Sequence, residues 1–144
     1  MASMKQKYGG KQGSFALDLA KFSGEVQEAI GLTLREIVVL VGDSLITMSP
    51  VDTGRFRGNW QFNLMTPDNS TTEDFDPTGA ETRAKIVTGA NSFTPGQVAY
   101  ITNSLPYAIP LEHGHSLKAP LGMVGITQAR FQDIVDEAVR NHKV

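Results

Sequence analysis

The chain has 144 residues, 40% of them hydrophobic and 19% charged, and a formal net charge of −2. This composition suits one globular domain with a full core, and the near-neutral charge gives no overall signature of nucleic-acid binding. The absence of cysteine excludes disulfides and thiolate metal sites. No apolar run in the sequence approaches the roughly 20 residues that a membrane-spanning helix needs.

Residues 1–13 are rich in glycine, lysine and glutamine and carry almost no apolar side chain. Such a segment cannot bury enough apolar surface to offset the entropy lost on ordering. It also lacks the apolar stretch of a signal peptide. We therefore predict a flexible arm, or else an end derived from a cloning vector, over residues 1–13. Residues 14–144 are predicted to form a single domain.

Residues 14–48 are predicted to be helical, because their apolar side chains recur every three or four residues. Ser14 is a suitable N-cap. Each glycine in this stretch weakens a helix by about 1 kcal/mol relative to alanine. The segment therefore either breaks near Ser23–Gly24 or forms one helix of ~30 residues, which is long for so small a domain. Residues 37–42 are apolar nearly all round, so we expect the sheet or a second subunit to bury them.

The stretch after this helix is predicted to be a structural corner made by Pro50, Asp52, Thr53 and Gly54. Proline stops the helix, Asp52 can accept hydrogen bonds within a turn, and Gly54 permits a positive φ. The triplet Asp-Thr-Gly is also the signature of aspartic proteases. A protease site needs two carboxylates that share a proton, and here a single triplet lies between a helix and a strand. The structural interpretation is therefore favoured.

Residues 56–65 alternate between apolar and polar side chains, which is typical of a half-buried strand. Residues 83–90 and 97–104 are also expected to be strands, and residues 123–141 a helix. The long polar loop Thr66–Glu81 carries five acidic residues: Asp68, Glu73, Asp74, Asp76 and Glu81. Consecutive strands between terminal helices indicate the α+β class. We predict a long N-terminal helix, an antiparallel sheet of three or more strands, and a C-terminal helix packed on the sheet.

Two groups of side chains could carry chemistry. Glu112, His113 and His115 could bind a metal or serve a small hydrolase, but the two histidines point the same way only in an extended segment, and the glycine between them indicates a turn. Glu112 is expected instead to accept hydrogen bonds from backbone N–H groups or from an arginine. Arg55 and Arg57, next to aromatic residues, could contact single-stranded nucleic acid, but charges on a solvent-facing side explain them equally well.

Three stretches together resemble one family. They are "SPVDTGRFRGNWQ" from residue 49, "YITNSLPYAIPLEHGHS" from residue 100 and "KAPLGMVGITQARFQDIV" from residue 118. In this order over one small domain, they resemble the tail-component or neck proteins of long-tailed bacteriophages, which include tail-completion, minor tail and head–tail joining proteins. The resemblance covers roughly residues 15–139. His113 stands where an aromatic residue is common, and the length of the acidic loop varies among members.

The resemblance implies a structural protein of the virion rather than an enzyme, with no catalytic residue, cofactor or metal and no membrane partner. Members are expected to form rings at the head-proximal end of the tail, and we expect six copies. The partners implied are further copies of the chain, adjacent neck proteins and tail-tube proteins, with DNA only in transit. The layer (tail terminator, tail completion or connector) stays open. The alternative is a nucleic-acid-binding protein that uses Arg55, Arg57 and the N-terminal lysines.

We make two further predictions, one for the acidic loop and one for residues 103–122. The acidic loop is expected to be mobile in the free protein and to line the lumen of the ring, where negative walls would keep DNA from sticking. Residues 103–122 are expected to pack near the corner, with Tyr107 and Leu111 as apolar anchors of a contact. We expect Arg55 or Arg57 to pair with Glu112, within a subunit or across the ring. The alternative is that residues 103–122 form a packing loop within the subunit that binds no partner.

Overall fold

The computed structural model describes residues 12–114, 116–119 and 121–143. The elements in chain order are helix α2 (Gln12–Met48), the short 3₁₀ helix η1 (Arg57–Asn59), strand β1 (Gln61–Leu64), helix α3 (Ala80–Ala90), strand β2 (Ala99–Thr102), and helices α4 (Ala108–Glu112), α5 (Val124–Ala129) and α6 (Phe131–Asn141). The fold mixes helices with an antiparallel sheet, which agrees with the predicted α+β class. The predicted arm lies outside the described residues except for residues 12 and 13, which already belong to α2.

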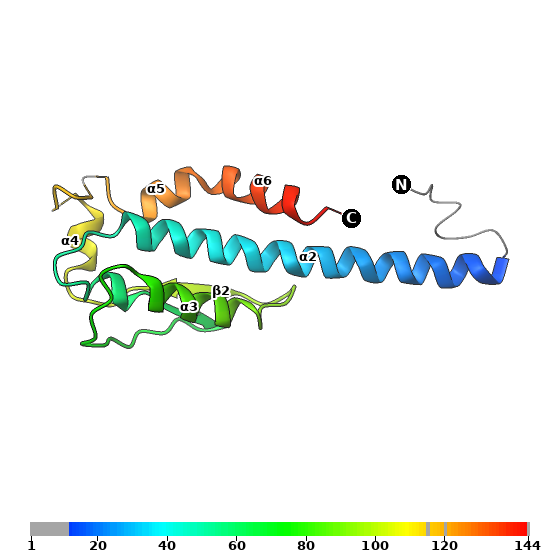
Figure 1. Cartoon of the computed structure of the whole chain (residues 1–144), viewed down its shortest axis with the longest axis horizontal. Coiled ribbons are helices and arrows are strands. Elements are labelled where there is room, and N and C mark those ends of the chain that lie inside the picture. The colour runs from blue at the N-terminus through cyan, green and yellow to red at the C-terminus, as the bar shows by residue number, and fades with distance from the viewer. Residues whose placement is uncertain (1–11, 115, 120, 144) are drawn as a thin grey trace.

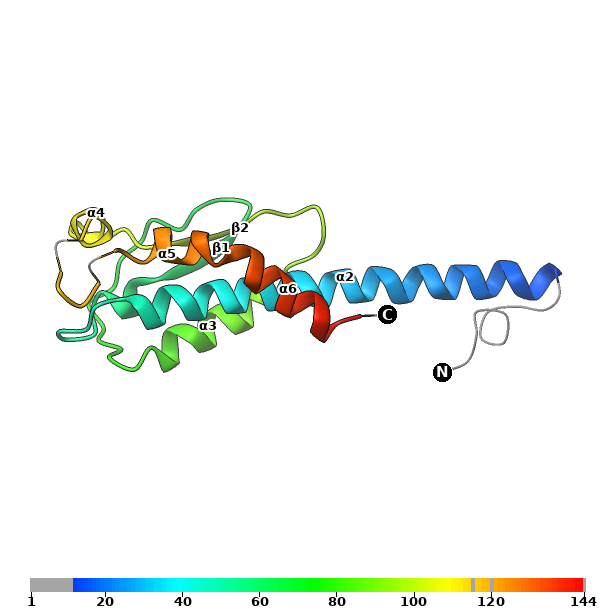
Figure 2. The same cartoon turned by 90° about the horizontal axis from the view of Figure 1, so that it is seen from above.

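Helix α2 is continuous over 37 residues, about 55 Å, so a break near Ser23–Gly24 is wrong. Its C-terminal half is held by the core, where Val38, Leu45 and Ile46 are buried. Helix propagation adds one hydrogen bond per residue and is cheap once this half has formed, so isolated glycines do not break it. In both views the first half of α2 extends beyond the body formed by the other elements (Figures 1 and 2).

The sheet is smaller than the sequence predicts. Strand β1 pairs antiparallel with β2, in the register Gln61↔Thr102 to Leu64↔Ala99. These two strands make up the whole sheet in the described part of the chain, so the prediction of three or more strands is wrong. The expected strand over residues 56–65 begins only at Gln61, because the buried residues Phe56 and Trp60 lie one helical turn apart and pack from η1 and its flanks.

The expected strand over residues 83–90 is wrong, because this segment belongs to helix α3. Thr82, Ile86 and Ala90 follow one another at intervals of four and are all buried, which is helical rather than strand spacing. Ile86 packs directly on α2, where a Cβ added to Gly42 would lie 3.0 Å from its Cδ1 atom.

The C-terminal helix is interrupted at Arg130 and packs on α2 rather than directly on the sheet. Figure 1 shows α5 and α6 along the face of α2 opposite α3 and β2. A hydrogen bond of 2.7 Å joins the Ser44 and Thr127 hydroxyls, and Asn141 donates to Glu36. An apolar groove of about 480 Å³ separates α5 from β2, with walls that include Val41, Ile101 and Phe131.

One hydrophobic core joins these elements, and it lies around the C-terminal half of α2. Its buried members are Val38, Leu45, Ile46, Phe56, Trp60, Ile86, Ala90, Phe93, Leu105, Ala119 and Met123. Of the apolar stretch 37–42, Val38 and Gly42 are buried and the others half-buried, so neighbouring elements of the same subunit cover most of it. Within the described residues, no helix has both the length and the apolar character that crossing a bilayer requires.

Candidate functional site: the corner after helix α2

The corner, residues 49–60, begins with a serine that locks the end of α2. The Ser49 hydroxyl donates to the Leu45 carbonyl at 2.6 Å and accepts the indole N–H of Trp60 at 2.7 Å. Ser49 and Trp60 are both buried, so each polar atom needs this partner. Phe56 packs edge-on against the Trp60 ring with 5.9 Å between centroids. The last turn of α2 is therefore tied to the start of β1.

Gly54 makes the sharpest turn of the corner. Its φ is +91°, and a Cβ there would lie 2.4 Å from the Pro77 backbone nitrogen. Its carbonyl accepts the N–H groups of Gly58 and Asp76, each at 3.0 Å. Only a glycine combines this φ with the close approach of the Pro77 backbone, so the expected positive φ at this position is confirmed.

Arg57 satisfies the end of α2. Its guanidinium donates to the Ser49 carbonyl at 2.8 Å, to the Thr47 carbonyl at 3.4 Å and to the Pro77 carbonyl at 2.9 Å. The last carbonyls of a helix lack intrahelical partners, and a cation is favourable there. Burial lowers the pKa of Arg57, and the charge of Asp76 opposes that shift. This arginine is a structural clamp between α2 and the acidic loop.

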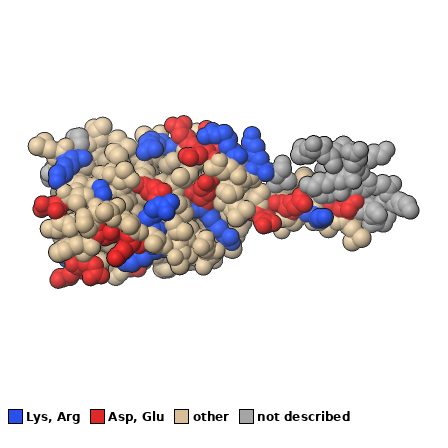
Figure 3. All heavy atoms as spheres, viewed as in Figure 1, with Lys and Arg blue, Asp and Glu red and all other residues tan. Residues whose placement is uncertain are grey.

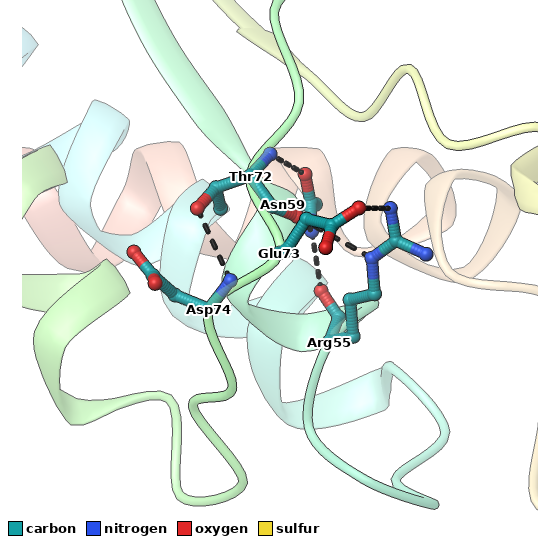
Figure 4. Close-up of polar contacts among 5 residues, drawn as sticks. All are labelled: Arg55, Asn59, Thr72, Glu73 and Asp74. Atoms are coloured by element: carbon teal, nitrogen blue, oxygen red, sulfur yellow. Dashed lines mark hydrogen bonds and ion pairs between the residues drawn. The ribbon is translucent and has the colours of Figure 1, made fainter.

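Asn59 joins the corner to the acidic loop, as Figure 4 shows. The side chain is fully buried, with 0% relative exposure. Its amide N–H₂ donates to the carbonyls of Arg55 (2.7 Å) and Thr72 (2.9 Å), and its carbonyl oxygen accepts the N–H of Thr72 at 2.8 Å. Arg55 adds a bond of 3.4 Å to the Thr72 carbonyl and an ion pair of 3.9 Å with the exposed Glu73. Both the N–H and the C=O group of Thr72 are thus hydrogen-bonded to the Asn59 side chain.

Asp76 connects the acidic loop to α3. Its carboxylate is buried and accepts both the N–H (2.8 Å) and the hydroxyl (2.7 Å) of Thr82 in the first turn of the helix. Burial raises the pKa of Asp76, but these bonds, with others from the backbone of Glu81 and Gly79, lower it below its ordinary value. Because it is buried, Asp76 cannot line a lumen, so that part of the expectation is wrong.

The other acidic residues of the loop lie toward solvent. Glu73, Asp74 and Glu81 are exposed, and Asp68 accepts the N–H and hydroxyl of Ser70, which lower its pKa. The path of the loop from Thr72 to Gly79 is fixed by the bonds to Asn59, Gly54 and Arg57. This geometry argues against the expected mobility of that half of the loop.

The described part of the segment 103–122 packs on the corner, as the sequence predicts. The Asn103 side chain donates to the Phe56 carbonyl at 2.9 Å, and the Lys118 ammonium donates to the Val51 carbonyl at 2.6 Å. The ring of Tyr107 lies 5.8 Å from that of Phe56, and Leu111 packs against the core. A pocket of about 340 Å³ lies between the two segments.

Glu112 holds the start of α5, so its predicted pairing with Arg55 or Arg57 within the subunit is wrong, and the pairing across a ring stays a prediction. The carboxylate accepts the N–H groups of Met123 and Val124 at 2.8 Å each and of Gly125 at 2.9 Å. Burial raises the pKa of Glu112, while these three bonds together lower it below its ordinary value. The alternative expectation, an acceptor for backbone N–H groups, is the one observed.

Asp52 does not act as the turn former that the sequence predicts. It is exposed, and among the described residues its carboxylate accepts no hydrogen bond. The short local bond at this point runs from the Arg55 N–H to the Thr53 hydroxyl at 3.3 Å. The corner is shaped by Gly54, Arg57 and Asn59, and Asp52 is one of the residues that line the pocket.

Arg57 at the corner, Asp76 and Glu112 all bond to backbone groups, and these bonds fix the direction of the chain at three places. The exit from α2, the start of α3 and the start of α5 each depend on one of them. Within the described ranges, no three metal-binding side chains converge. His113 is exposed, and His115 lies outside the described residues.

Sequence reasoning missed Asn59 and Ser49, because their partners are remote in the chain or belong to the backbone. Asn59 falls on the polar side of the alternating stretch 56–65, so the local pattern predicts an exposed rather than a buried side chain. No protein-family model, curated protein or solved structure matches the chain.

Proposed function

We propose that the chain is a ring-forming structural component of the neck of a tailed phage, a tail-completion, tail-terminator or head–tail joining protein. The observation that carries the proposal is the meeting of all three resembling stretches at one corner. Glu112 of the second stretch bonds Met123 of the third, and Asn103 of the second bonds Phe56 of the first. Motifs that form one bonded unit in space support a shared fold unit better than three separate short matches.

The surface fits a subunit that needs neighbours. Among the residues that the structure describes, fourteen large hydrophobic side chains are exposed, including Leu17 and Leu19 on the first half of α2 and Val124 and Phe131 beside the apolar groove. A contiguous exposed apolar patch often marks a site of contact with another protein. Each subunit of a closed ring buries one patch against a different patch of the next. We propose six copies per ring, placed between the connector and the tail tube.

The nucleic-acid alternative has less support. The guanidinium of Arg57 donates to three backbone carbonyls, and Arg55 bonds Thr72 and Glu73, so both arginines already have partners within the subunit. On the face drawn in Figure 3, positive and negative side chains are interspersed rather than gathered into a basic patch. The N-terminal lysines lie outside the described residues.

Deleting the coding sequence from the phage or prophage that carries it tests this proposal. Electron microscopy should show DNA-filled heads and tails that remain unjoined, or tails of abnormal length. Supplying the protein from a plasmid should restore joined particles. Normal infectious particles in the deletion strain would overturn the proposal. A strong salt dependence of DNA affinity, together with normal particles, would favour the nucleic-acid alternative.

A further inference from the structure

Helix α2 uses a glycine where a second helix crosses it closely. At Gly42 the side chain of Ile86 from α3 comes so near that an added Cβ would lie 3.0 Å from its Cδ1 atom and 3.1 Å from its Cγ2 atom. The missing side chain therefore has a packing reason at this position. Without such a reason a helical glycine costs about 1 kcal/mol relative to alanine.

Gly24 has the same direction on the helix, but no part of the chain that the structure describes packs against it. It precedes Gly42 by 18 residues, which is about five full turns of 3.6 residues, so both glycines lie on one face of α2. No described atom lies within 4 Å of where a Cβ of Gly24 would be. Figures 1 and 2 show the N-terminal end of α2 beyond the body of the domain.

The residues around Gly24 on this face form a self-complementary row. At helical spacing the row is Leu17, Lys21, Gly24, Glu28 and Leu32. Leu17 is 75% exposed and Leu32 39%, and Lys21 and Glu28 are exposed as well. About a centre between residues 24 and 25, the two leucines are equidistant, and so are the lysine and the glutamate. Reversing the helix thus places leucine on leucine and opposite charges on each other.

We propose that this row is an interaction surface for a second copy of the chain, with the two α2 helices antiparallel and crossing at Gly24. Lys21 of each copy faces Glu28 of the other, which gives two ion pairs across the crossing. Leu17 of each copy packs on Leu32 of the other at the two ends. The missing Cβ at the centre lets the helices approach closely, as it does at Gly42.

This contact goes beyond the proposed function. It is isologous, with the same patch on both copies, so it pairs two subunits and does not close a ring by itself. It concerns residues 17–32 of α2 and does not depend on whether the protein belongs to a phage neck.

Cysteine cross-linking tests the arrangement directly, because the chain has no cysteine of its own. Under mild oxidation Gly24→Cys should form a covalent dimer. A mixture of Leu17→Cys and Leu32→Cys should cross-link, whereas each of these two variants alone should not. Leu19→Cys is the control, since this exposed side chain points away from the row. No dimer with Gly24→Cys, or equal cross-linking of Leu19→Cys, would overturn the proposal.

Charge reversal tests the pairing, with the dimer dissociation constant measured by sedimentation equilibrium. Lys21→Glu and Glu28→Lys should each weaken the dimer roughly tenfold or more, because two attractions become two repulsions. The double variant should return to within about threefold of the original affinity. Lys85→Glu makes the same charge change on the exposed side of α3 and should have no effect. A chain that stays monomeric at 100 µM, or a double variant weaker than either single one, would contradict the proposal. Circular dichroism should show unchanged helix content in every variant.

Discussion

Asn59 and Thr72, thirteen residues apart, form a closed pair in which the buried amide of one satisfies both the N–H and the C=O of the other. Thr72, a residue of an irregular loop, thereby has both of its backbone polar groups hydrogen-bonded, as a residue inside a sheet does. The pair fixes the acidic loop to the corner.

Asn59→Ala should destabilise the protein by about 2–4 kcal/mol in urea unfolding, because it leaves the carbonyl of Arg55 and the peptide groups of Thr72 without this partner. The amide of Thr72 should also exchange with solvent much faster. Asn63→Ala is the matched control, since the Asn63 side chain is exposed and bonds only to Thr66 in the described structure. It should cost under about 0.5 kcal/mol. Equal losses for the two variants would refute the role of Asn59.

Gly54→Ala should cost clearly more than Gly96→Ala. The two glycines have nearly the same φ, +91° and +92°, so the conformational cost of a side chain is matched. An added Cβ at Gly54 would collide with the Pro77 backbone, whereas at Gly96 it would meet no described atom. Gly96→Ala should lose about 1 kcal/mol and Gly54→Ala roughly 3 kcal/mol or more, by urea unfolding. Equal losses would mean that the loop near Pro77 yields at little cost.

Acid should destabilise the protein through Asp76 and Glu112. Both have a folded-state pKa below the ordinary value, so the stability they contribute is present above the unfolded-state pKa and is lost as pH falls through the folded-state pKa. The free energy of unfolding should therefore fall from roughly pH 5 downward. Asp76→Asn should lose stability less steeply over this range, although it is weaker at pH 7. Glu137→Gln, on the exposed side of α6, should keep the original slope. An unchanged slope in Asp76→Asn would contradict the assignment.

Glu112→Arg should destabilise the protein by about 2 kcal/mol or more, because three N–H groups at the start of α5 lose their acceptor. Adding Arg57→Glu should make matters worse, since Arg57 bonds Ser49 and Pro77 rather than Glu112. Glu112→Gln should be intermediate, because it keeps one acceptor oxygen. Recovery of stability in the Arg57→Glu double variant would show that the two charges interact after all.

The sequence predicts α2, β2 and the corner because each has a strong local signal: a long apolar stripe, an alternating run, and a proline followed by Gly54. It fails for α3, because the eight residues 83–90 are too few for their apolar spacing to distinguish a strand from a short helix. The helix buries Thr82 and Ile86 on one face. Asn59 and Ser49 could not be predicted as the corner's central bonds, because their roles depend on long-range packing. The sequence predicts Glu112 as a hydrogen-bond acceptor. Whether its donors are an arginine or backbone N–H groups depends on where α5 begins, which the sequence does not specify.

Electron cryomicroscopy of the intact phage particle tests the central claim most directly. The account predicts a closed ring at the head–tail junction whose subunit density fits α2, the corner and α5–α6 of this chain. A neck in which every layer is fitted by other proteins, or this chain located elsewhere in the particle or absent from it, would contradict the account.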